Sequence, residues 1–111
     1  MRILPLAAAL ALAMPAFAQE ATTLQNVTLR GIVMKVFGAE VPITYTPDGK
    51  FTARPPGDEV SGFWKINGDK LCTTTTTDPK ESCTVYPPGK KSGDTFDVTS
   101  AAFGVVSVTI K

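Results

Sequence analysis

Turn-forming residues interrupt this chain so often that no long regular element fits between them. The clearest signals are Pro47-Asp48-Gly49, Pro55-Pro56-Gly57, Asn67-Gly68 and residues 87–94, which include two prolines and two glycines. Proline fixes one backbone angle of a turn, and glycine accepts the positive φ that many turns require. The runs between these turns are short and rich in threonine and β-branched residues, which favours β-strands.

The alternation of apolar and polar residues predicts about eight short strands and an all-β fold. We expect these strands at residues 28–37, 41–45, 51–54, 60–66, 70–76, 82–86, 95–99 and 105–110. No stretch of residues 19–111 sustains a helical period, and a slip in the alternation at Gly31 predicts a β-bulge in the first strand. The connections are too short for parallel crossovers, so we expect an antiparallel meander.

A meander of this size forms either a small up-and-down barrel or a two-sheet sandwich. The barrel is favoured because closure removes exposed edge strands. Alternate turns of a meander lie at the same end, which groups 48–49, 67–68 and 87–94 together. The opposite end receives the segments 38–40, 55–59, 76–81 and 100–103. This second end lacks tight two-residue turns and is predicted to be the open mouth.

Residues 1–18 are predicted to form a signal peptide that is removed from the mature protein. Arg2 gives a positive start, residues 3–14 are apolar, and Ala16-Phe17-Ala18 matches the small-residue pattern of a signal-peptidase site. The apolar run is shorter than the about 20 residues that a membrane-spanning helix needs, and it lacks the polar face of a buried helix. We therefore expect one monomeric domain over residues 19–111, periplasmic or secreted and not inserted in a membrane.

The only two cysteines of the chain are Cys72 and Cys83. Their spacing is too wide for a Cys-x-x-Cys redox site, and two cysteines without any histidine do not complete a zinc site. In the oxidising periplasm a disulfide is the expected state of such a pair. We therefore predict a structural bridge between strands 70–76 and 82–86, at the base of a loop over residues 73–82.

Composition argues against catalysis and against nucleic-acid binding. Without histidine the usual general base is missing, and no Gly-x-Ser-x-Gly or Ser-x-x-Lys motif occurs in residues 19–111. The chain has 11 Lys and Arg residues and 10 Asp and Glu residues, and loss of Arg2 with the signal peptide balances them. Phosphate binding needs basic residues concentrated on one face, and no basic tract occurs. We expect no enzyme, no cofactor, no metal and no nucleic-acid partner.

Three aromatic residues are candidates to line a ligand site: Trp64, Tyr45 and Phe51. Trp64 either fills the core beside Val60 and Ile66, or lines a cavity together with the other two aromatic residues. An eight-stranded barrel is either just filled or able to hold one small ligand. The shortness of the strands favours a filled interior.

Two loops are candidates for contact with another protein. Pro55 and Pro56 stiffen the first loop, and Lys90 and Lys91 make the second locally basic, although two lysines also suit a solvated loop tip. Two functions therefore stay open. One is a non-enzymatic periplasmic module that binds a small ligand, peptide or glycan. The other is an inhibitor or envelope-interaction module that contacts an envelope protein through rigid loops.

Four short motifs carry a family resemblance: Asp48-Gly-Lys-Phe51, Gly62-Phe-Trp64, Gly68-Asp-Lys-Leu-Cys72 and Ser82-Cys83. This pattern resembles small secreted β proteins of proteobacteria and is similar to the punctuation of lipocalin-like domains. The resemblance covers about residues 45–86, and it places Gly-x-Trp in the middle of the chain, whereas lipocalins carry it on the first strand. It implies a small exported β-barrel and supplies no catalytic residue.

Overall fold

The computed structural model describes residues 21–111; the predicted signal peptide, residues 1–18, lies outside the described residues. The described part begins with one short helix, α2 (Thr23–Arg30), and continues with eight strands. The strands are β1 (Ile32–Val36), β2 (Ala39–Tyr45), β3 (Lys50–Ala53), β4 (Val60–Asn67), β5 (Lys70–Thr75), β6 (Asp78–Val85), β7 (Thr95–Ser100) and β8 (Gly104–Ile110). All strand pairs are antiparallel, which confirms the predicted eight-stranded meander.

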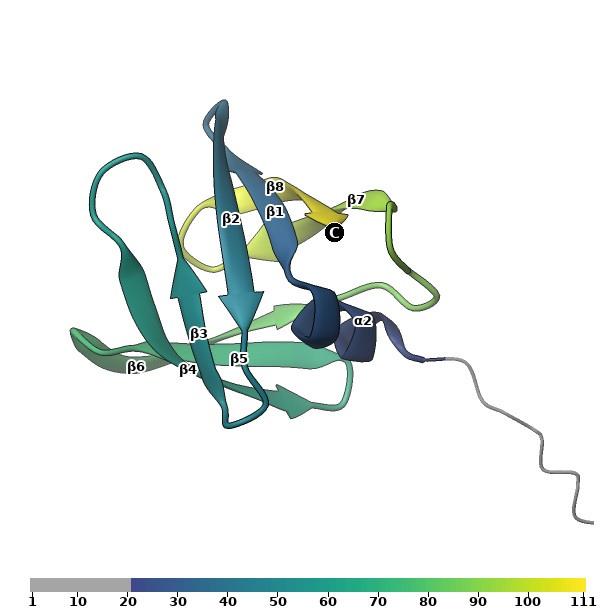
Figure 1. Ribbon diagram of the computed structural model, residues 1–111, viewed down its shortest axis with the longest axis horizontal. Coiled ribbons are helices and arrows are strands. Elements are labelled where there is room, and N and C mark those ends of the chain that lie inside the picture. The colour runs from purple at the N-terminus through teal and green to yellow at the C-terminus, as the bar shows by residue number, and fades with distance from the viewer. Residues whose placement is uncertain (1–20) are drawn as a thin grey trace, which may run out of the picture.

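The eight strands form a single sheet that curls on itself into a barrel-like shape (Figure 1). Its order is β6-β5-β4-β3-β2-β1-β8-β7, so the last strand returns to pair with the first. The ladder stops between β6 and β7, which approach each other without pairing. The barrel is therefore open along one seam. Asp78, Pro79 and Lys80 lie on edge strand β6, and charges and proline oppose the addition of a further strand.

The helix α2 replaces the first part of the strand predicted over residues 28–37. The Thr22 hydroxyl accepts a hydrogen bond from the Gln25 N–H at 3.1 Å, and the Gln25 side-chain oxygen accepts one from the Thr22 N–H at 2.8 Å. This reciprocal capping box fixes the start of the helix. Gly31 ends it with φ 81°, a conformation that glycine adopts without strain. The slip in alternation at Gly31 is thus the junction of helix and strand rather than a β-bulge.

The helix covers one end of the curled sheet, beside the start of β1 and the end of β2 (Figure 1). It buries Leu24 and Val27, which lie one turn apart on the same face. The core continues along the inner face of the sheet with Ile32, Ile43, Phe51, Ala53, Leu71, Tyr86, Val98, Val106, Val108 and Ile110. Within residues 21–111 no helix has the length and apolar character needed to cross a membrane.

Strand β6 begins four residues earlier than the sequence predicted, at Asp78, whereas β5 ends one residue earlier, at Thr75. The loop expected over residues 73–82 is mostly paired strand, with Thr73 opposite Ser82 and Thr75 opposite Asp78. Only residues 76–77 form the turn between the two strands. The threonine run favours strand on one side of this turn, and Pro79 is tolerated on the other because β6 is an edge strand.

Gly62 marks the place where β4 comes closest to β5. A Cβ atom at this position would collide with the carbonyl oxygen of Thr74 and lie 2.7 Å from the Cα of Thr75. Glycine in a strand interior often permits such an approach of two backbones, and it allows a sheet to bend sharply. The curl that brings β5 and β6 across from β1 and β2 therefore depends on the missing side chain at Gly62.

Candidate functional site

The curled sheet surrounds a cavity of about 740 Å³. Small-molecule sites commonly measure about 300–1,000 Å³, so this cavity has room for one ligand. The interior is therefore filled only in part: core residues such as Ile43, Leu71 and Val98 pack together and also border this open cavity. Several inward positions carry small side chains, such as Ala39, Ala53 and Thr73, and the larger rings gather toward one end.

The cavity lining reaches the end of the sheet that was predicted to be the mouth. Pro55 and Pro56, in the turn between β3 and β4, contribute to the lining there, and so do Ala101, Ala102 and Phe103 in the turn after β7. The opposite end is covered by α2. The cavity thus has a floor near the helix and a rim built from turns.

The lining divides into an apolar wall and a polar wall. The apolar wall comes from inward positions of β1 to β4, namely Met34, Val36, Ala39, Val41, Ile43, Phe51, Ala53 and Val60. The polar wall comes from β5 and β6; apart from Leu71 it consists of Thr73, Thr75, Asp78, Lys80, Glu81, Ser82 and Thr84. A molecule inside would meet aliphatic groups on one side and hydroxyl groups on the other, with the charged side chains near the mouth.

The three predicted aromatic residues lie together near the floor. The ring of Tyr45 is 6.4 Å from that of Phe51 and 6.1 Å from that of Trp64, centre to centre. Tyr45 and Phe51 line the cavity, whereas Trp64 is outside the lining. Trp64 packs edge-to-face on Tyr45 and donates a hydrogen bond from Nε1 to the carbonyl oxygen of Thr46 at 3.0 Å. Its role is to support Tyr45 rather than to face the cavity.

Tyr86 also lines the floor and was missed by the sequence analysis. It follows β6 directly, is only 4% exposed, and packs edge-to-face against Phe96 with ring centres 6.0 Å apart. This contact spans the open seam between β6 and β7. The signal was present in the sequence, because Tyr86 has the same alternation phase as Ser82 and Thr84, opposite to Cys83.

Burial keeps both floor tyrosines protonated. It raises the pKa of Tyr86 to about 12. It also raises the pKa of Tyr45 well above its usual range, with a further contribution from repulsion between the two phenolate charges. Both hydroxyls therefore remain available as hydrogen-bond donors throughout the neutral pH range.

Titration with base tests this burial directly, because Tyr45 and Tyr86 are the only tyrosines in the chain. At pH 10, where a free tyrosine is about half ionised, we expect almost no tyrosinate absorbance from the folded protein. Since the folded pKa values exceed the unfolded ones, their contribution to stability is complete below about pH 10 and is lost as the pH rises toward about 12. The same titration in denaturant is the control, and ionisation near pH 10 in the folded state would contradict the burial.

The two predicted interaction loops differ in how they are held: contacts with the helix and Phe96 anchor the loop with Lys90. Thr23 Oγ1 donates to the Pro87 carbonyl oxygen at 2.6 Å and accepts from the Lys90 N–H at 2.9 Å. The Lys90 ammonium lies 5.9 Å from the centre of the Phe96 ring, within the range of a cation–π contact. Lys91 is exposed beside it. The other loop carries Pro55 and Pro56, which belong to the rim of the cavity.

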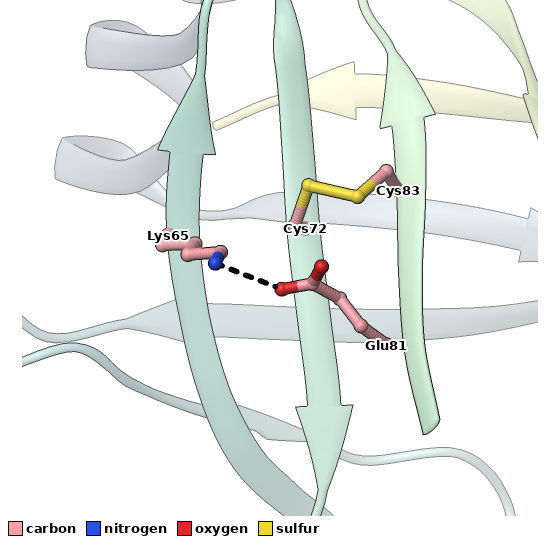
Figure 2. The surroundings of a disulfide bond; sticks show 4 residues. All are labelled: Lys65, Cys72, Glu81 and Cys83. Atoms are coloured by element: carbon pink, nitrogen blue, oxygen red, sulfur yellow. Dashed lines mark ion pairs between the residues drawn. A yellow bond between two sulfur atoms is a disulfide. The ribbon is translucent and has the colours of Figure 1, made fainter. Parts of the chain in front are cut away.

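A disulfide joins Cys72 of β5 to Cys83 of β6, which confirms the predicted bridge (Figure 2). The two cysteines are directly paired and have the opposite alternation phase to Leu71 and Thr73, which line the cavity. The bridge therefore lies on the outer face of the sheet. An ion pair of 3.2 Å between Lys65 and Glu81 runs beside it from β4 to β6. Such a bridge fits a protein of an oxidising compartment.

The disulfide also bears on metal binding. Within residues 21–111, one group of potential metal ligands comes together, consisting of Cys72, Glu81 and Cys83. Both sulfur atoms are bonded to each other, so neither is available as a thiolate, the form in which cysteine binds metals. This group is therefore a structural feature of the β5–β6 pair.

An aromatic pair stands beside the rim. Phe37, in the turn between β1 and β2, is 88% exposed, and its ring contacts that of Phe103 edge-to-face at 6.1 Å. Phe37 also has φ 50°, in the left-handed region that costs a residue with a side chain about 1–2 kcal/mol. No local sequence pattern indicates this pair, because the two turns meet only in the folded sheet.

This site offers a ligand an apolar surface, several hydroxyl groups and an open rim. They suit the binding of a molecule that is apolar over most of its surface and carries few polar groups. Comparison of the chain with models of protein families, with curated proteins and with solved structures finds no match, so its function has to be inferred from the cavity itself.

Proposed function

We propose that this protein is a non-enzymatic binding protein, periplasmic or secreted and monomeric, which holds one small and largely apolar ligand inside the curled sheet. The observation that carries the proposal is the cavity of about 740 Å³, apolar on one wall and reaching the rim. Export follows from the predicted signal peptide and agrees with the disulfide.

Packing energetics support a ligand in this space. Protein interiors are normally packed as densely as organic crystals, and apolar voids reduce stability. Met34, Val36 and Val41 are packed against the core on one side and border the cavity on the other. A small molecule that covered these side chains would gain hydrophobic free energy of about 25 cal/mol for each Å² removed from water.

The alternative function, a protein inhibitor acting through rigid loops, has less support. An inhibitory loop stands clear of its scaffold so that it can enter a partner. Here Pro55 and Pro56 border the cavity, and Lys90 is held by the helix and by Phe96. The loop with Pro55 and Pro56 therefore belongs to the ligand site, and the loop with Lys90 is anchored to the helix.

A fluorescence titration with the neutral apolar dye N-phenyl-1-naphthylamine tests the proposal. We expect saturable binding of one dye molecule per protein. Val41→Phe combined with Ala53→Phe places two rings into the cavity and is expected to weaken binding at least about tenfold, a loss of about 1.4 kcal/mol or more. Thr44→Phe adds the same ring to the exposed outer face of β2 and should leave binding unchanged. Absence of saturable binding, or equal binding by the filled variant, would contradict an internal ligand site.

A further inference from the structure

The floor of the cavity carries two tyrosine hydroxyl groups, of which Tyr86 is buried and Tyr45 is partly buried. Tyr45 ends β2 and Tyr86 follows β6, and both side chains contribute to the cavity lining. Both β2 and β6 run from the rim toward the floor, so both residues lie at the floor end of the cavity. Among residues 21–111, neither hydroxyl makes a hydrogen bond to another residue. Their backbones are bonded: the Tyr86 N–H donates to the Asp69 carbonyl oxygen at 2.9 Å, and Tyr45 pairs with Phe51 in the ladder of β2 and β3.

Two unsatisfied donors at one place are unusual for a protein interior. Most buried polar groups have a hydrogen-bond partner, and a buried donor without one costs about 1–3 kcal/mol. Tyr86 is only 4% exposed, so bulk water reaches it poorly. The missing acceptor therefore has to come from the cavity itself, which both side chains line.

The surroundings of the two hydroxyls restrict the kind of acceptor. The rings of Phe51, Trp64 and Phe96 pack against the two tyrosines. No nearby cation among the described residues lowers the pKa of either phenol. The charged residues of the polar wall, Asp78, Lys80 and Glu81, lie in the first half of β6, toward the rim. A buried anion at the floor would be uncompensated, whereas a neutral acceptor would not.

We propose that the cavity takes a neutral molecule with an apolar body and a carbonyl oxygen at one end, and that the tyrosine hydroxyls at the floor, those of Tyr86 and Tyr45, donate hydrogen bonds to this end of the ligand. A carbonyl oxygen has two lone pairs, which matches two donors. The ligand class is a long-chain ketone, aldehyde or ester. Its carbonyl group enters the cavity first and reaches the floor, and its chain lies along the apolar wall. This inference rests on the proposed function and adds the chemistry and the direction of the ligand.

Competition against the naphthylamine dye tests the inference with three probes of equal chain length: 2-dodecanone, dodecane and dodecanoate. We expect the ketone to bind about tenfold more tightly than the alkane, because two hydrogen bonds are added to the same apolar contact. Tyr45→Phe and Tyr86→Phe keep the rings and remove only the hydroxyls. Each should weaken ketone binding about threefold and leave alkane binding unchanged.

A spectroscopic measurement separates hydrogen bonding from packing. The infrared carbonyl stretch of bound 2-dodecanone should lie at lower frequency in the wild type than in the variant with both tyrosines replaced by phenylalanine. Equal binding of ketone and alkane, with no effect of the substitutions, would overturn the inference and leave an apolar ligand site in place. Tighter binding of dodecanoate than of the ketone would also overturn it. Failure of the dye and of every probe to bind would overturn both proposals.

Discussion

Replacement of Gly62 by alanine is expected to lower the free energy of unfolding by about 3 kcal/mol, a large effect for a single methyl group. The new Cβ would collide with the Thr74 carbonyl oxygen and lie 2.7 Å from the Cα of Thr75. Both neighbours are backbone atoms of β5, so relief requires the two strands to move apart. Movement of β5 would in turn disturb its ladder with β6 and flatten the curl that encloses the cavity.

Urea unfolding of Gly62→Ala measures this effect as a lower midpoint. The matched control is Ser61→Ala, which makes a change of similar size at the next residue of β4, where the side chain is exposed. We expect the control to unfold within about 0.5 kcal/mol of the wild type. Equal stability of the two variants would show that the close approach at Gly62 is not needed for the curl.

Removal of the disulfide by Cys72→Ala together with Cys83→Ala is expected to cost about 3 kcal/mol, through the entropy regained by the unfolded chain. The structure adds a second consequence. β6 pairs only with β5, and the bridge joins these two strands directly. Without it the polar wall of the cavity depends on a single ladder at the open seam. We therefore expect weaker binding of the naphthylamine dye as well as lower stability.

Urea unfolding with and without reductant provides the measurement. The reduced wild type and the double alanine variant should unfold at similar urea concentrations, both well below the oxidised wild type. Lys65→Met serves as the control, because it removes the exposed ion pair to Glu81 beside the bridge and should cost no more than about 1 kcal/mol. An oxidised and a reduced protein of equal stability would contradict a stabilising role of the bridge.

Local sequence signals predicted the strands well where neighbouring segments pair directly. The alternation of apolar and polar residues and the Asn67-Gly68 turn placed β4 and β5 to within about one residue, the uncertainty inherent in element boundaries. The helix α2 was missed because it has only eight residues, and Val27 and Leu29 fit a strand alternation equally well. Its hydrogen bond from Thr23 to Pro87 depends on a contact that no local pattern reveals.

The candidate site was predictable only where local alternation decides which way a side chain faces. Alternation along β2 and β3 correctly directed Tyr45 and Phe51 inward. Whether inward side chains fill the interior depends on where the large rings gather, and here they collect near the floor. Tyr86 reaches that floor from the far end of the meander, and the open seam beside it results from the pairing of β8 with β1. Both features are properties of the folded sheet as a whole.

The position of a bound molecule is measured most directly by methyl NMR during titration with N-phenyl-1-naphthylamine. The prediction is that saturable shifts concentrate on methyl groups that line the cavity, those of Val41, Ile43, Leu71 and Val98. Exposed methyl groups provide the internal control and should not shift, namely those of Leu29, Val85 and Val105. Shifts concentrated on this exposed set, or no saturable shift at all, would contradict a ligand site inside the curled sheet.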